Sequence, residues 1–168
     1  MDLTLLIVRV VVGLGFVAHG GQKLFGAFGG YGLAGTGGYF ELVGWKPGKM
    51  FAFAAGAAEL VGGVLIALGL LGPIGPMLAI ATMIVAIAVH APAGFFGQNG
   101  GFELPLAYIG LFLLFAFGGY GAYALDAAFG LATVFTPTMD AAVVGLGILG
   151  GLANIAIRRK PAPAPSTT

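Results

Sequence analysis

Hydrophobic residues run almost without interruption through five stretches of the chain, which are separated by short polar or glycine-rich segments. These stretches cover residues 3–22, 50–71, 74–91, 102–119 and 141–157. A helix needs about 20 apolar residues to span the hydrocarbon layer, and continuous apolar runs of that length argue against strands. The pattern predicts five membrane-spanning helices. A tight turn at Gly72-Pro73 would join the second and third as an antiparallel hairpin.

The composition indicates an integral membrane protein. Of the 168 residues, 59% are hydrophobic and 8% are charged, whereas a soluble domain carries about 25% charged residues. The net charge of +1 comes with no basic face that could bind nucleic acid. The chain has no cysteine, which excludes disulfide exchange and thiolate-ligated metal or iron–sulfur sites on this chain. The expected fold class is therefore all-α integral membrane.

The basic residues indicate how the helices are oriented. With five crossings, one side of the membrane receives the first loop, the third loop and the C-terminus, and with them Lys23, Lys46, Lys49, Arg158, Arg159 and Lys160. The other side has no Lys or Arg outside the predicted helices. Because basic loops face the cytoplasm, we expect a cytoplasmic C-terminus and an external N-terminus.

Two charged residues lie deep within predicted spans. At about 1.5 Å per residue, Arg9 lies about 9 Å from the outer face on the first helix, and Glu59 lies about 15 Å from either face on the second. Isolated charges in lipid are unfavourable, and an extended arginine covers the offset of about 6 Å. These positions predict an Arg9–Glu59 ion pair. The pair would be a structural clasp between the two spans or, alternatively, part of a proton or substrate relay.

A second group of polar residues gathers at the cytoplasmic ends of the spans. His19 and His90 each lie about 24 Å along helices that run in the same direction, so both reach the same depth. Lys23 follows one turn after His19, and Glu103 stands at the start of the fourth span. These four residues predict a polar pocket at the membrane interface.

Three uses of such a pocket are compatible with its residues. Histidine and a carboxylate can exchange protons with a quinone as it is reduced, which would place His19 and His90 at the quinone headgroup. Two histidines can also ligate haem iron. Alternatively, His19 and Lys23 only extend to the lipid headgroups. No separate metal-ion site is expected.

The segment 26–50, "GAFGGYGLAGTGGYFELVGWKPGKM", is long for a connection between membrane helices. Thr36 is a candidate N-cap for a short helix, and Tyr39, Phe40 and Trp45 fit a stretch whose aromatic rings lie at headgroup level. The segment is either a lid over the His19/His90 pocket or a linker on the membrane surface. Its glycines lack the strand and the G-K-[ST] ending of a nucleotide-binding loop.

The last predicted span carries a small-residue motif and is followed by a proline-rich tail. Gly147 and Gly151 form a GxxxG pair, which lets helix backbones approach each other closely in lipid. We expect this face to pack within the membrane, either in the ordinary way or as a docking element for a partner subunit. The tail "PAPAPSTT" is expected to be disordered.

Several motifs together resemble the DoxX family of small bacterial membrane proteins. They are "HGGQKLFG", "GGYGLAGT", "AGAAELVGG", "GGFELPLAY" and "GAYALDA", in order across residues 4–127. The resemblance implies a four-helix membrane bundle in the bacterial inner membrane. It also implies similarity to the large subunit of an archaeal thiosulfate:quinone oxidoreductase and to the membrane anchor of an oxidative-stress complex. The recurrent polar positions of the family fall here on Arg9, His19, Lys23, Glu59, His90 and Glu103.

Residues and resemblance together predict three regions and two alternative functions. Residues 1–130 would form a DoxX-like antiparallel four-helix domain, 131–158 an added fifth membrane helix, and 159–168 a disordered cytoplasmic tail. The first function is an accessory or structural subunit of a larger membrane redox complex, in contact with lipids and with other subunits. The alternative is a catalytic quinone-linked oxidoreductase subunit. Whether the chain is an enzyme is left open.

Overall fold

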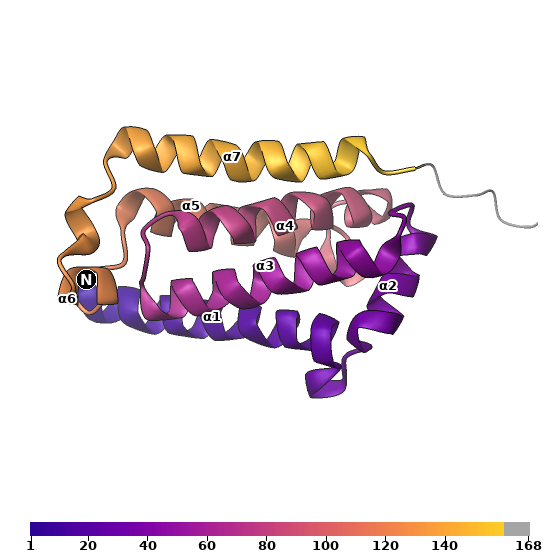
Figure 1. The fold of residues 1–168 in the computed structure, drawn as a ribbon, viewed down its shortest axis with the longest axis horizontal. Coiled ribbons are helices and arrows are strands. Elements are labelled where there is room, and N and C mark those ends of the chain that lie inside the picture. The colour runs from indigo at the N-terminus through magenta and orange to yellow at the C-terminus, as the bar shows by residue number, and fades with distance from the viewer. Residues whose placement is uncertain (160–168) are drawn as a thin grey trace, which may run out of the picture.

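The computed structural model describes residues 1–159, in which the regular secondary structure is helical (Figure 1). No strand occurs in this range, so the all-helical class is confirmed. Except for Arg159, the predicted disordered tail lies outside the described residues. The long apolar helices are α1 (Asp2–Phe25), α3 (Gly48–Leu68), α4 (Ile74–His90), α5 (Glu103–Gly118) and α7 (Pro137–Ala156).

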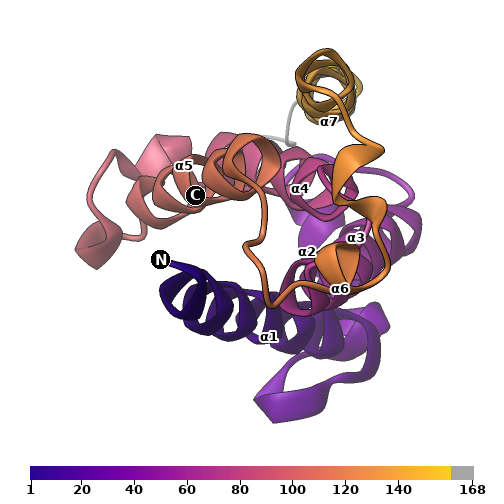
Figure 2. The same ribbon diagram turned by 90° about the vertical axis from the view of Figure 1, so that its left-hand side faces the viewer.

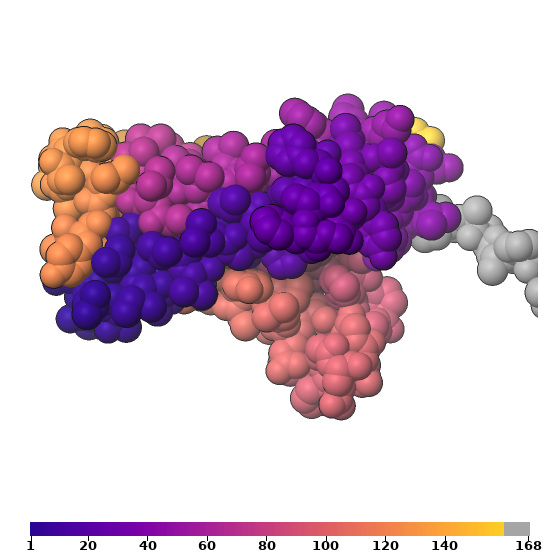
Figure 3. Space-filling view, turned by 90° about the horizontal axis from the view of Figure 1, so that it is seen from below, coloured from indigo at the N-terminus to yellow at the C-terminus, as the bar shows by residue number. Residues whose placement is uncertain are grey.

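Shorter helical elements connect the long ones. At one end of the bundle, α1 leads through η1 (Ala27–Gly29) into α2 (Gly32–Leu42). At the same end, η2 (Ala91–Ala93) and η3 (Gly97–Asn99) join α4 to α5, and this exposed segment projects beyond the packed helices (Figure 3). At the opposite end, α6 (Leu125–Ala128) and η4 (Leu131–Thr133) join α5 to α7.

Four helical segments are long and apolar enough to cross a membrane, as judged by length and composition. They are Asp2–Phe25, Gly48–Leu68, Ile74–Ala93 and Pro137–Ala156. This confirms the membrane class of the chain. Helix α5 is apolar but has 16 residues, which gives a length of about 24 Å against a hydrocarbon core of about 30 Å. The count of five crossings therefore stays a prediction.

The long helices run antiparallel in chain order, with α7 on the outside. Seen end-on, α1, α3, α4 and α5 follow one another around the bundle, and α7 lies against α4 on the side away from α1 (Figure 2). The main apolar core forms where the rings of Phe16, Phe112 and Phe115 meet aliphatic side chains of α3 and α4. One residue of α7, Val144, reaches this core.

The glycine face of α7 packs against α4 of the same chain. A β-carbon at Gly147 would lie 2.6 Å from the Met77 carbonyl oxygen, and one at Gly151 would lie 2.9 Å from Cβ of Ile84. The two helix backbones are therefore as close as the GxxxG spacing allows. The hypothesis that Gly147 and Gly151 dock a partner subunit is corrected, because α4 already covers both residues.

Helices α1 and α3 are also joined through glycines, and these contacts set their register. Gly13 lies against Gly63 and Ala67, and Gly20 lies against Gly56 and Leu60. This register places Arg9 beside the C-terminal end of α3. The buried Arg9 guanidinium donates to the carbonyl oxygens of Ala67 (2.8 Å) and Tyr123 (2.6 Å).

The predicted Arg9–Glu59 ion pair is therefore wrong. Eight residues separate Glu59 from Ala67, which is about 12 Å along α3. Arg9 does link the first two spans, as expected of a clasp, but it binds backbone carbonyls rather than a carboxylate. The depths estimated from the sequence failed because they took the ends of the two helices to be level, whereas the contacts of Gly13 and Gly20 place Arg9 beside the last turn of α3.

Asp126 holds the turn between α3 and α4 at the same end of the bundle. Its two carboxylate oxygens accept from the backbone N–H groups of Leu71 (2.8 Å) and Gly72 (2.7 Å), both of which have positive φ. The buried Tyr120 hydroxyl donates to the Gly72 carbonyl oxygen. Burial, and secondarily the Asp126 charge, raises the pKa of Tyr120, so the phenol stays a neutral donor.

Replacing Asp126 by alanine should destabilise the fold by about 3 kcal/mol. The variant leaves two turn N–H groups without their charged acceptor, and hydrogen bonds to charged groups contribute about 1.5–3 kcal/mol each. Asp126→Asn retains one carboxamide oxygen and should lose less. The free energy of unfolding in mixed detergent–SDS micelles measures both variants. An Asp126→Ala variant as stable as the wild type would show that the turn holds without the carboxylate.

Candidate functional site

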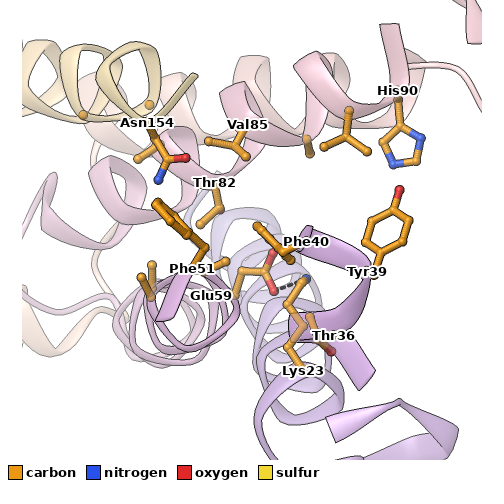
Figure 4. Close-up of a pocket in the computed structure, with 18 residues that line it drawn as sticks. Lys23, Thr36, Tyr39, Phe40, Phe51, Glu59, Thr82, Val85, His90 and Asn154 are labelled. Carbon is orange, nitrogen blue, oxygen red and sulfur yellow. Dashed lines mark hydrogen bonds and ion pairs between the residues drawn. The ribbon is translucent and has the colours of Figure 1, made fainter. Parts of the chain in front are cut away.

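A cavity of about 400 Å³ lies between α2, α3, α4 and α7, near the end of the bundle where α1 finishes. Most of its wall is apolar and built from small or aromatic side chains. Its polar side chains are the Lys23–Glu59 pair with Thr36 nearby, Tyr39 facing His90, and Thr82 and Asn154 on α4 and α7 (Figure 4).

An ion pair between Lys23 and Glu59 forms the charged part of the cavity wall. The Lys23 Nζ lies 2.5 Å from a carboxylate oxygen of Glu59. Glu59 comes from the middle of α3 and its side chain is 5% exposed, whereas the side chain of Lys23, in the last turn of α1, is 26% exposed. Glu59 is thus paired with a residue predicted to belong to the polar pocket, instead of with Arg9.

His90 stands at the end of α4, and its ring is held by one hydrogen bond. Its Nδ1 donates to the Gly100 carbonyl oxygen at 2.7 Å, and because a carbonyl can only accept, the proton is on Nδ1. In the neutral ring, the lone pair of Nε2 is the one that can accept a proton. The Tyr39 hydroxyl points from α2 toward the His90 ring (Figure 4).

The other two residues of the predicted pocket do not line this cavity. His19 is exposed on α1, where its ring makes an edge contact with Phe16. The Glu103 carboxylate accepts from the Gly97 N–H at 2.9 Å and so closes the segment between α4 and α5. Of the four residues predicted to form the polar pocket, Lys23 and His90 line this cavity and the other two do not.

The haem hypothesis does not fit this arrangement. It required His19 and His90 on opposite sides of one ring, and only His90 lines the cavity. Among residues 1–159, no group of three or more His, Cys, Asp or Glu side chains is placed to hold a metal ion.

Helix α2 covers the cavity, as the lid hypothesis for residues 26–50 predicts. The cavity that it covers is lined by His90 but not by His19. Thr36, predicted as an N-cap, lies inside the helix and is buried, since α2 begins earlier, at Gly32. On the other side of α2 lies a second cavity of about 710 Å³. Both cavities are lined by Lys23, Thr36 and Tyr39, so one turn of α2 separates them.

Small residues line the cavity where it meets the surface between α3 and α7. Ala54 of α3 and Gly150 of α7 are both exposed and both line the cavity. This surface belongs to the apolar sides of two membrane-capable helices. An apolar chain could therefore pass from the cavity into the lipid at this point.

The turn between α2 and α3 and the end of α7 pack against the outer side of residues that line the cavity. Trp45, expected at headgroup level, is instead fully buried, and its Nε1 donates to the Asn154 carbonyl oxygen at 3.0 Å. The Arg158 guanidinium lies 4.7 Å from the centre of the Trp45 ring and donates to the carbonyl oxygens of Val43 and Ala88. Helix α7 is thus fastened to both α2 and α4.

The fold and the cavity together define a helical membrane protein with an internal, mostly apolar cavity that contains one ion pair. Comparison with known proteins agrees with this class. The family model described as DoxX matches residues 4–92, just over half of the chain. The chain belongs to the DoxX family.

One relative extends the similarity beyond that region. An uncharacterized protein of Haemophilus influenzae is 35% identical over 125 residues, which cover 72% of this chain and 87% of the relative. No solved structure matches the chain. The family match contains Lys23, Glu59 and His90 but ends before α5 and α7.

Proposed function

We propose that this protein binds a quinone headgroup in the cavity beneath α2 and serves as a subunit of a membrane redox complex. The observation that carries the proposal is the Lys23–Glu59 ion pair in the wall of an apolar cavity that reaches the lipid-facing surface. Charged groups inside membrane helices are costly and mark functional sites more often than structural ones. A quinone combines the polar ring and the apolar tail that such a cavity suits.

The size and the donor set of the cavity fit a quinone. Ligand pockets enclose roughly 300–1,000 Å³, and this cavity encloses about 400 Å³. Lys23 can donate to a ring oxygen while Glu59 keeps its charge balanced. His90, with Nε2 free to accept, can exchange a proton with the ligand or with water at the cavity mouth. The tail would leave between Ala54 and Gly150.

The electrons would come from a partner subunit. The chain has no cysteine to ligate an iron–sulfur cluster or to carry sulfur covalently. This favours a quinone-binding accessory role over an oxidoreductase that works alone. The partner would bind elsewhere than the glycine face of α7, which packs on α4.

We place the protein in the bacterial inner membrane, with the α2 end of the bundle on the cytoplasmic side. Lys46, Lys49, Arg158 and Arg159 lie at that end, together with Lys23. Basic residues at helix ends favour the cytoplasm. The cavity would then open near the cytoplasmic leaflet.

Binding of a short-chain benzoquinone should quench the fluorescence of Trp45, the single tryptophan of the chain. Trp45 packs against Phe40 and Phe51, which line the cavity, so a quinone in the cavity lies one residue away from the fluorophore. The purified protein in lipid nanodiscs is titrated with decyl-benzoquinone. We expect a saturable quenching component that is weakened at least tenfold when Lys23→Met and Glu59→Met are combined.

Lys49→Met is the matched control, because Lys49 is exposed at the same end of the bundle and lies outside the cavity. The quinone should quench the fluorescence of this variant as strongly as that of the wild type. Free tryptophan in the same nanodiscs measures quenching by quinone dissolved in the lipid. If the wild type shows only that unsaturable quenching, the proposed function is rejected.

A further inference from the structure

Five aromatic rings stand exposed at the α2 end of the bundle, in two groups. Phe25, Phe28 and Tyr31 lie on the turn that leads from α1 through η1 into α2, and Phe95 and Phe96 lie on the segment between α4 and α5. Phe28 and Tyr31 are 77% and 86% exposed. Within residues 1–159, neither apolar core includes any of the five. Exposed apolar side chains that gather in patches mark surfaces of interaction.

The backbone that presents Phe28 is strained. Its φ of 51° and ψ of 36° lie in the left-handed region, which residues with a β-carbon rarely adopt. Gly26 and Gly29, close by in the same turn, also have positive φ, so glycine occupies the comparable positions. Strained backbone conformations cluster at functional positions, and burial of the ring inside the protein does not explain this one.

The segment between α4 and α5 holds the second group in a defined arrangement. The Phe95 ring makes edge contacts with Phe96 and Phe102, with centroids 5.2 and 5.5 Å apart. The Glu103 N–H donates to the Phe95 carbonyl oxygen at 2.9 Å, and the Glu103 carboxylate accepts from the Gly97 N–H. The rings of Phe95 and Phe96 are therefore exposed by an ordered, hydrogen-bonded segment.

The two groups project from different sides of the bundle at the same level. Figure 1 shows the turn after α1 projecting to one side, and Figure 3, which has the same horizontal axis, shows the segment between α4 and α5 projecting to another. This level is the end of α1, whose 24 residues extend about 36 Å, past a hydrocarbon core of about 30 Å. A protein partner would cover one side of the bundle, whereas lipid surrounds every side at this level.

We infer that Phe28 and Phe96, together with their aromatic neighbours, insert into the lipid interface and anchor the α2 end of the bundle at a fixed depth. Phenyl rings bury at the boundary between headgroups and acyl chains, while the Tyr31 hydroxyl can stay among the headgroups. This role falls to residues other than Phe40 and Trp45, which are buried. Because Tyr31 also lines the second cavity, that cavity opens at headgroup level.

Spin labels on single introduced cysteines test the inference, since the chain has no cysteine of its own. Phe28→Cys and Phe96→Cys are labelled, reconstituted in lipid vesicles and measured by electron paramagnetic resonance with oxygen, which concentrates in lipid, and with a nickel chelate, which stays in water. Lys46→Cys, exposed in the turn after α2, is the aqueous reference. Leu14→Cys, exposed in the middle of α1, is the lipid reference.

We expect the ratio of oxygen to nickel accessibility at positions Phe28 and Phe96 to be at least threefold higher than at Lys46 and lower than at Leu14. A ratio at both positions equal to that at Lys46 would place the rings in water and overturn the inference. Labels that neither reagent reaches would show that another protein surface covers the rings, which would overturn it as well. Neither failure bears on the quinone titration, so the proposed function stands or falls separately.

Discussion

Replacing Lys23 by methionine is expected to destabilise the protein by about 3–5 kcal/mol, the cost of breaking a buried ion pair. The variant leaves the Glu59 carboxylate, whose side chain is 5% exposed, without its cation in an apolar wall. Glu59→Met should cost less, because the freed Lys23 ammonium is 26% exposed and can extend to the aqueous interface. The free energies of unfolding of the wild type and of the two variants in mixed micelles measure both losses.

The combined variant, with both Lys23 and Glu59 replaced by methionine, tests whether this cost comes from breaking the ion pair or from losing each side chain independently. Replacing a whole buried pair by apolar side chains of similar volume is often neutral. We therefore expect the double variant to recover most of the stability lost in Lys23→Met. A double variant as unstable as the sum of the single variants would show that the two residues act independently rather than as a pair.

Gly13→Leu is expected to disrupt the packing of α1 on α3 and to cost more than about 3 kcal/mol, beyond the usual range for overpacked cores. The first atom of any side chain at Gly13 would lie 2.6 Å from the backbone nitrogen of Ala67 and the backbone oxygen of Gly63. Backbone atoms cannot move aside as a flexible side chain can. The helices would have to separate along their whole seam.

Gly15→Leu is the matched substitution on the same helix. A side chain at Gly15 meets no atom within 4 Å, so this variant should keep the wild-type stability and elute as a single species from a sizing column. Gly13→Leu should elute mainly as aggregate or unfold at a much lower SDS fraction. Equal behaviour of the two variants would mean that the α1–α3 seam is looser than the contacts of Gly13 indicate.

Much of the fold follows from the hydrophobic pattern. Continuous apolar runs in lipid favour helices, because a helix satisfies all its backbone hydrogen bonds internally. The runs predicted from the sequence overlap α1, α3, α4, α5 and α7. What the pattern does not define is where each helix begins. Helix α3 starts before its apolar run, because Gly48 and Lys49 already form its first turn. Errors of a few residues at helix ends become errors of several ångströms in depth.

The pairing of charges could have been predicted from a different signal. Gly13 and Gly20 are seven residues apart, as are Gly56 and Gly63. Seven residues are close to two helical turns, so each pair lies on one face. Matching the two faces in antiparallel order gives the register observed and places Glu59 within reach of α1's last turns. Depth counted from helix ends that were taken to be level gave Arg9 as the partner instead.

The uncharged residues of the cavity were not identified from the sequence. Thr82 and Asn154 are single polar residues in apolar helices, where they also occur as ordinary packing residues. Only the packing of α7 on α4 shows that Asn154 reaches the same cavity as Glu59. His19 was misplaced for a related reason: its predicted depth equals that of His90, but the direction in which its side chain leaves α1 depends on the neighbours of that helix.

The attachment of α7 has a consequence for biogenesis. Helix α7 is the last of the described helices to leave the ribosome, and its end is fastened by Arg158 to the loop after α2 and to the end of α4. The earlier helices can insert and pair while the chain is still being made. The cavity, however, acquires its fourth wall only when α7 docks. Translation must therefore pass Arg158 before a ligand can be held, and ligand binding would report on completed membrane assembly.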